Sequence, residues 1–164
     1  MIRSLGTSFS TSSRLVSVSY THLDVYKRQV HIRGTVTLAW PGRLLCIQDG
    51  LHGLCAQTDQ TTPLTPGELV DVIGFPIIGA FTPSLSRATY RAAGGRQPVS
   101  AVPVTADQAL RGNHDAGLVE LEGQLIGQDD SASDPTIVLS SENYVFSAVL
   151  PAQYGAVSYT HLSL

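Results

Sequence analysis

Histidines are the first residues in this chain that could do chemistry. Three lie between residues 30 and 156: His31 on the polar face of an expected strand, and His52 and His114 in expected turns. Acid-base or nucleophilic catalysis needs a partner group that converges on the imidazole. Because the pattern around each histidine is that of a polar surface, we expect all three at the surface and assign no catalytic residue.

Aspartates and cysteines are the next candidates, as metal ligands. Asp129, Asp130 and Asp134 lie close together, but they lack the alternating ligand positions and the terminal glutamate of a calcium loop. Cys46 and Cys55 have no ligand-spaced histidine nearby, which argues against zinc. We therefore expect the aspartates in a solvated hairpin turn, and we predict no metal and no cofactor.

The two cysteines could also form a disulfide. They lie nine residues apart across an expected hairpin, and they share a face only if the strands pair with an odd sum of residue numbers. A disulfide fits an exported protein, whereas two buried free thiols are the alternative. The sequence leaves both open, and the free thiols are the slightly favoured interpretation.

The elements that must position these residues are strands. Apolar and polar residues alternate from Val30 to Leu38, with Val30, Gly34 and Leu38 on the face that we expect inside. Glycines at the turns supply the positive φ angles that tight connections need. The one expected helix is a short turn capped by Thr105. Strands are expected over residues 30–38, 44–49, 53–58, 68–75 and 84–91, and again over 118–128, 136–140 and 144–150.

Glycine-centred strands open both halves of the chain. Residues 32–36 and 121–125 share the order apolar, charged, glycine, polar, apolar, centred on Gly34 and Gly123. A glycine inside a strand marks a bulge or a tight bend at a barrel corner. We therefore expect an all-β fold, with an OB-like five-stranded barrel over 30–97, a linker with a short helix over 98–116, and an incomplete second OB-like unit over 117–156.

The two ends of the chain share a repeat of a different kind. Val-Ser-Tyr-Thr-His-Leu occurs at 18–23 and at 157–162. The longer copy, 18–29, can be back-translated into DNA that is its own reverse complement up to the last two bases. It resembles the transposon mosaic end of a sequencing adaptor. We expect segment 1–29 to be adaptor-derived or unrelated and segment 157–164 to be adaptor-derived. Both should pack little against the barrel, and neither informs the expected fold.

The net charge becomes more negative once these flanks are set aside. Residues 30–156 contain six arginines, no lysine and twelve acidic residues, a net charge of −6. A nucleic-acid-binding surface is normally basic, so we expect no nucleic-acid partner. No apolar run approaches a membrane span, and residues 1–17 lack the apolar block of a signal peptide.

A set of strand and turn segments resembles a known region; these segments are 32–36, 44–50, 66–75, 81–83 and 118–123. Together they are similar to the tandem OB-like N-terminal region of bacterial membrane-bound sensor histidine kinases. The resemblance implies a position outside the cytoplasmic membrane, periplasmic or extracytoplasmic, in a membrane-anchored parent protein with a kinase core downstream. The chain itself has no ATP-binding motif, so the expected role is a non-catalytic sensory or interaction module.

A barrel of this type binds ligands over strands 2 and 3 and the flanking loops. Those loops contain Trp40, Arg43, Phe75 and Phe81, which are the candidate ligand-binding residues. Aromatic side chains there can stack on a sugar, a base or a partner's side chain, although Trp40 and Phe81 could instead close the ends of the barrel. The expected partner is an unidentified small ligand or protein. A nucleic-acid-binding OB protein and a carbohydrate-binding accessory module are the alternatives.

Overall fold

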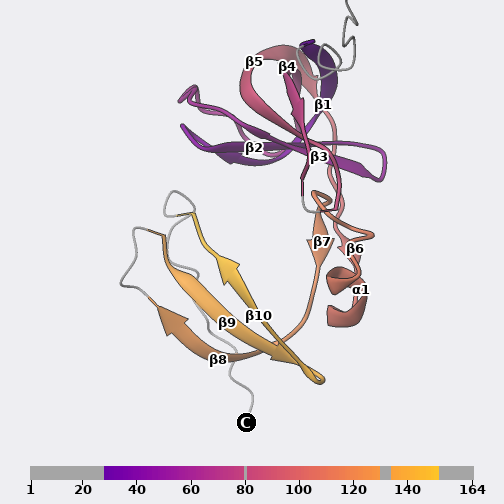
Figure 1. The fold of residues 1–164 in the computed structure, drawn as a ribbon, viewed down its shortest axis with the longest axis vertical. Coiled ribbons are helices and arrows are strands. Elements are labelled where there is room, and N and C mark those ends of the chain that lie inside the picture. Colours follow the sequence, from indigo (N-terminus) through magenta and orange to yellow (C-terminus); the bar gives the residue numbers. More distant parts are fainter. Residues whose placement is uncertain (1–27, 80, 130–133, 152–164) are drawn as a thin grey trace, which may run out of the picture.

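The computed structural model describes residues 28–79, 81–129 and 134–151, and these form an all-β fold with one short helix (Figure 1). The first five strands close into a ring in the order β1-β2-β3-β5-β4, with β4 returning to pair with β1. The expected loose packing of 1–29 and 157–164 lies outside the described residues, except for Arg28 and Gln29. The ring strands are β1 (Val30–Trp40), β2 (Leu44–Asp49), β3 (His52–Gln57), β4 (Glu68–Ile77) and β5 (Ser84–Arg96).

The rest of the described chain forms a linker and a second sheet. In the linker, β6 (Val102–Pro103) pairs in parallel with β7 (Val119–Glu120), and helix α1 (Ala106–Leu110) lies between them in sequence. The second sheet has the order β10-β9-β8, made by β8 (Gln124–Asp129), β9 (Thr136–Ser141) and β10 (Tyr144–Val149). Figure 1 shows β6, β7 and α1 on the path from the ring to this sheet. No helix in the described ranges has the length and apolar character needed to cross a bilayer.

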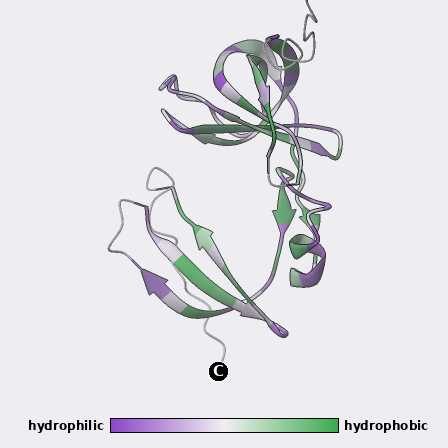
Figure 2. Ribbon diagram, in the orientation of Figure 1, coloured by the Kyte–Doolittle hydropathy of each residue, from purple (hydrophilic) through white to green (hydrophobic). Residues whose placement is uncertain are grey.

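Apolar side chains from all five strands fill the inside of the ring. The largest fully buried ones are Leu45, Ile47, Leu85, Val36, Val70 and Val72. Burial of this kind is the main favourable contribution to folding. In the linker and second sheet the hydrophobic colour of Figure 2 follows β7 and the middle of β9, where Ile137 is buried. The ring therefore holds the principal core.

A bulge in β1 changes which residues reach that core. Val36 pairs with Ile47 and Leu38 with Cys46, so Thr37 has no opposite residue on β2. An unpaired extra residue reverses the inward and outward alternation beyond it. Ala39 is consequently buried where the alternation predicted Leu38. Gly34, which was expected to mark a bulge or a tight bend, lies three residues before the bulge and makes room for Ile47, whose Cδ1 would lie 3.0 Å from an added Cβ.

Cys46 and Cys55 are joined by a disulfide. The register of β2 and β3 places them directly opposite each other, with the Cα atoms 4.1 Å apart. The favoured interpretation of two free thiols is therefore wrong. Its basis was an undetermined register, and the tight turn at Gly50, with a φ of 58°, fixes that register.

The seam between β3 and β5 has one ladder pair, Ala56 opposite Leu85. Side chains supply further bonds across it. The Gln60 carboxamide accepts from the Tyr90 backbone N–H and donates to the Tyr90 carbonyl, both at 2.9 Å. Ser84 Oγ donates to the Cys55 carbonyl at 2.6 Å. Ring closure therefore depends on polar side chains as well as on strand pairing.

Two element boundaries differ most from the sequence expectation. Strand β5 continues to Arg96 because it pairs with β4 as far as Glu68. The single strand expected over 118–128 is divided into β7 and β8, since the chain leaves β6 after Glu120 and pairs with β9 from Gln124. The helix prediction is confirmed: Thr105 caps α1 and forms a capping box with Gln108.

Candidate ligand-binding site

Trp40 and Arg43 lie together at the turn between β1 and β2. The Arg43 N–H donates to the Trp40 carbonyl at 3.0 Å, and Gly42, with a φ of 73°, completes the turn. This folding of the turn places the Arg43 guanidinium 4.2 Å from the centroid of the indole ring. A guanidinium at this distance makes a cation–π contact. The two candidates are thus brought together by the turn itself.

An open cleft of about 540 Å³ begins at this pair. The size suits a small ligand. Its walls come from the β1–β2 turn, the end of β3 and the start of β5, and they combine apolar surface with polar and charged groups. The lining residues are Trp40, Arg43, Leu44, Gln57, Thr58, Asp59, Ser86 and Arg87.

Arg87 is one of the cleft residues that the sequence did not indicate. It lies at a bulge where β4 and β5 change register between Ile73 and Phe75, and its φ of 51° is in the left-handed region. Such a conformation is unfavourable for a residue with a Cβ, and it occurs often at binding sites. The guanidinium is 5.3 Å from the Phe75 ring centroid. Phe75 therefore supports Arg87 at the edge of the cleft.

Phe81 lines a different, apolar hollow of about 370 Å³ made by the β4–β5 connection. Its side chain is 66% exposed, and its ring lies against Gly112, where an added Cβ would be 2.2 Å from Cδ1. The neighbouring Thr82 donates from both its backbone N–H and its hydroxyl to Asp115. The hydrogen bond from the Thr82 hydroxyl is the largest cause that lowers the pKa of Asp115, and the bond from the Thr82 backbone N–H lowers it further. Phe81 thus belongs to the junction between ring and linker.

That junction contains a second pocket, of about 310 Å³, which His52 and His114 both line together with Asp115. The approach is close, because an added Cβ on Gly53 would lie 2.0 Å from the Ala116 carbonyl oxygen. Among the described residues, no three His, Cys, Asp or Glu side chains lie where they could hold a metal ion. The pocket offers no donor set for a cation.

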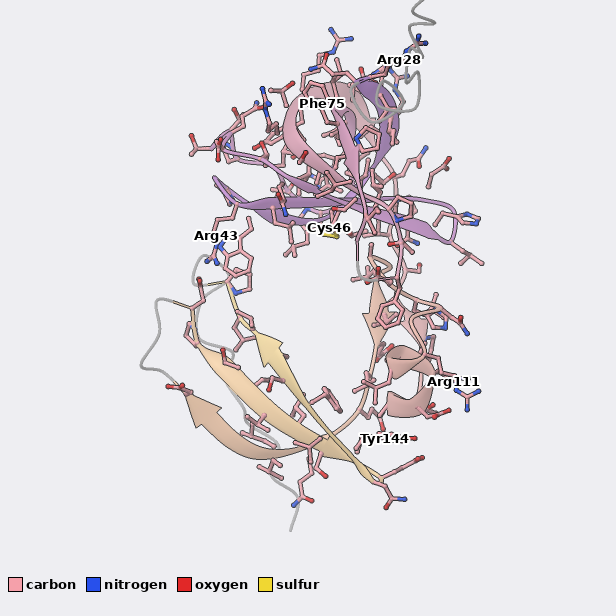
Figure 3. The ribbon with its side chains drawn as sticks, viewed as in Figure 1. Arg28, Arg43, Cys46, Phe75, Arg111 and Tyr144 are labelled. Carbon is pink, nitrogen blue, oxygen red and sulfur yellow. A yellow bond between two sulfur atoms is a disulfide. The ribbon has the colours of Figure 1, made fainter. Side chains whose placement is uncertain are left out.

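The second sheet reaches the cleft through one ion pair. Arg43 Nη1 bonds to Asp134, and Figure 3 shows Arg43 between the ring and the near end of the second sheet. At its other end this sheet is tied to α1, since the Tyr144 hydroxyl donates to Asp107 at 3.0 Å and Arg111 contacts the same carboxylate. Hydrogen bonding from Arg111 and then from Tyr144 lowers the pKa of Asp107. Within the described residues, the sheet therefore has a polar contact with the linker and another with the ring.

Charge is distributed unevenly along the chain. Residues 30–97 contain five arginines and four acidic residues, whereas 98–156 contain one arginine and eight acidic residues. Two of the ring arginines, Arg33 and Arg91, contact Asp71. Arg43 and Arg87 are the ones at the cleft. The cleft thus brings two of the five ring arginines together with Asp59, and Arg43 is paired with Asp134.

A scan against protein-family models found no match, and searches of curated proteins and of solved structures found no similar protein.

Proposed function

We propose that this chain is a non-catalytic sensory or interaction module from the extracytoplasmic part of a bacterial signal-transduction protein. It consists of an OB-like barrel and an incomplete second OB-like unit. The observation that carries the proposal is the cleft at Trp40, which opens on a closed ring of five strands. The cleft can hold a ligand without a catalytic group beside it.

The connectivity of the ring supports an OB-like barrel. A five-stranded Greek-key barrel of this kind binds ligands over strands 2 and 3 and the loop between strands 1 and 2. Here β3 runs parallel to β5, β4 closes on β1, and the cleft includes Leu44 of β2 and Gln57 of β3. Trp40 and Arg43 occupy the loop that such barrels use for recognition.

The second sheet repeats the first three strands of the ring. In β1 the bulge at Thr37 follows Gly34 by three residues, and in β8 the bulge at Ile126 follows Gly123 by three residues. Gly34 lies within β1 and Gly123 directly precedes β8, and after each of these strands the chain forms two more strands joined by a tight hairpin, β2–β3 and β9–β10. This shared irregularity supports a second OB-like unit over 117–156.

The disulfide between Cys46 and Cys55 supports a position outside the cytoplasm, because disulfides persist in oxidising compartments. The charge distribution opposes nucleic-acid binding. A protein that follows a phosphate backbone needs several converging cations, and here Arg43 is paired with Asp134 while Asp59 lines the same cleft.

Recovery of the uninterrupted gene from the source DNA tests the proposal. We expect a transmembrane segment and a histidine kinase core to be encoded downstream of Ala156. An intact gene that encodes neither would contradict the proposal. Binding of single-stranded DNA to the chain with salt-sensitive micromolar affinity would favour the nucleic-acid alternative instead.

Carbohydrate binding is the second candidate function, and the composition of the cleft favours it. Trp40 stands among Gln57, Thr58 and Ser86, which offer donors and acceptors for sugar hydroxyls. If the module binds a glycan, Trp40→Ala should abolish that binding and leave the unfolding midpoint nearly unchanged, because Trp40 is only partly buried. Glycan-array binding and thermal unfolding of both proteins check this.

A further inference from the structure

We propose that the Trp40 cleft binds an acidic sugar, and that the sugar's carboxylate takes the place of the Asp134 carboxylate on Arg43. The inference rests on the proposed function of the cleft as a binding site. It adds the chemical class of the ligand and a consequence for the contact between the ring and the second sheet.

The two guanidiniums of the cleft favour a negatively charged ligand. Arg43 and Arg87 both line the cleft, from the β1–β2 turn and from β5. Guanidiniums bind carboxylates through paired, charge-assisted hydrogen bonds. Arg43 already holds one carboxylate, that of Asp134. The group that the protein itself places on Arg43 therefore indicates the group that a ligand presents there.

The remaining walls decide what else the ligand carries. Gln57, Thr58 and Ser86 provide hydrogen-bonding groups, of which Thr58 is 4% exposed and already accepts the Gln60 N–H through its hydroxyl. Such walls suit several hydroxyls. Asp59 adds a negative charge that repels any anion, and it repels a phosphate more than a carboxylate because the phosphate carries more charge. A uronic acid has one carboxylate for the guanidiniums, several hydroxyls for the hydrogen-bonding walls, and less charge than a phosphate.

The left-handed backbone of Arg87 fits a binding role. A strand residue with a φ of 51° costs free energy that a glycine would avoid. The bulge nevertheless places an arginine there, at the cleft and over Phe75. Backbone strain at a ligand-facing cation is common in sites where the side chain must be held in position.

Competition at Arg43 links binding to the rest of the molecule. Arg43 and Asp134 form the ion pair that joins the ring to the second sheet. A ligand carboxylate on Arg43 removes that contact, while the Tyr144–Asp107 bond to α1 remains. Occupancy of the cleft thereby weakens a polar attachment of the second sheet to the ring.

Fluorescence titration of the full chain tests this proposal, because Trp40 is the only tryptophan in the sequence and reports on the cleft directly. The probes are galacturonate, the matched neutral sugar galactose, and inorganic phosphate. We expect saturable quenching by galacturonate, with galactose and phosphate at least about tenfold weaker. Equal affinity for galactose or for phosphate would overturn the proposal.

Variants test the roles of the charged residues. Arg43→Gln and Arg87→Gln should each weaken galacturonate binding about tenfold. Arg91→Gln, on the same strand as Arg87 and with the same loss of charge but outside the cleft, should not weaken it.

Asp134→Asn should tighten galacturonate binding about two- to fivefold, since it removes the internal competitor. The Asp134 result does not require the arginine variants to fold, and an unchanged or weaker affinity for Asp134→Asn overturns the competition. An intact gene with a kinase core but no galacturonate binding would leave the proposed function standing without this inference.

Discussion

The Arg87 guanidinium lies 5.3 Å from the centroid of the Phe75 ring, and the backbone of Arg87 adopts a left-handed φ of 51° to place it there. The two facts are connected by the bulge between β4 and β5, which gives β5 an extra residue opposite Gly74. A guanidinium supported on an aromatic ring is held in position without a salt bridge of its own. The bulge thus orders the cation at the wall of the cleft.

This strain can be measured by comparing two small replacements of the same residue. Arg87→Gly and Arg87→Ala both remove the guanidinium and its contact with Phe75. The glycine variant also removes the left-handed strain, so we expect it to be more stable by about 1 kcal/mol. This reverses the usual order inside a strand, where alanine is better than glycine. Urea unfolding of the two variants checks the prediction, and an alanine variant at least as stable as the glycine variant contradicts it.

The disulfide should contribute substantially to stability. Its loop between Cys46 and Cys55 is short, and the chain-entropy relation gives about 2–3 kcal/mol for a loop of this size. We expect the unfolding midpoint in urea to fall when dithiothreitol is added. The double variant Cys46→Ala/Cys55→Ala serves as the control, because its midpoint should not respond to reductant. A midpoint of the unsubstituted chain that is indifferent to dithiothreitol would count against the disulfide.

Acid should weaken the protein through Asp71. This carboxylate is 4% exposed and contacts His31, Arg33 and Arg91 across β1, β4 and β5. Hydrogen bonding from Arg33 is the largest cause that lowers its pKa to about 2, while burial opposes the shift. The folded-state pKa is below the unfolded value, so the contribution is present above about pH 4 and is lost as the pH falls through 2.

We therefore expect the stability difference between the unsubstituted chain and Asp71→Asn to be constant above about pH 4 and to shrink towards pH 2. Arg33→Gln is the matched test of cause, since it should remove most of this pH dependence while Asp71 stays in place. The measurement is the free energy of unfolding at a series of pH values. A difference that grows as the pH falls would show that the sign is wrong.

Gln60 should matter more than a loop residue usually does. Its carboxamide makes two 2.9 Å hydrogen bonds to the backbone of Tyr90, beside a seam that has one ladder pair. Gln60→Ala leaves both backbone groups without these partners, which should cost about 1–3 kcal/mol. Gln60→Glu should be at least as harmful at neutral pH, because a carboxylate cannot donate to the Tyr90 carbonyl.

Chemical unfolding compares these variants with Gln124→Ala, an exposed glutamine at the start of β8. That control should stay within about 0.5 kcal/mol of the unsubstituted chain. If Gln60→Ala is as stable as Gln124→Ala, the carboxamide does not contribute to ring closure.

Local patterns in the sequence predicted the local structure well. The all-β class, the strand positions, the Thr105 cap and the turn glycines depend on short-range preferences of the chain, and the structure agrees with them. The inward or outward direction of the β1 side chains beyond Thr37 could not be predicted. A bulge depends on the partner strand and does not show in the alternation of apolar and polar residues. The disulfide depended in the same way on a register that the sequence left open.

The candidate site was predictable only in part, for a related reason. Trp40 and Arg43 are three residues apart in one turn, so their proximity follows from local geometry. Arg87 joins them only because the ring closes β3 against β5, a relationship between distant segments. Phe81 was grouped with Trp40 by its position in a loop, yet its loop turns towards Gly112 in the linker. Whether these residues bind a ligand stays a prediction.

The junction between ring and linker offers a final test, at Gly53. An added Cβ there would meet the Ala116 carbonyl oxygen at 2.0 Å, and this atom belongs to a backbone segment whose Ala116 already has a φ of 59°. Gly53→Ala must therefore push the segment away, with a cost of about 1–3 kcal/mol. The displacement should also loosen the Leu118 N–H, which donates to Gln48 Oε1 at 3.2 Å. We expect faster hydrogen exchange at that amide.

Gly127→Ala is the control, because its added Cβ would make only ordinary contact with Val138. Unchanged exchange at Leu118 in Gly53→Ala would mean that the linker does not depend on its contact with the β2–β3 hairpin.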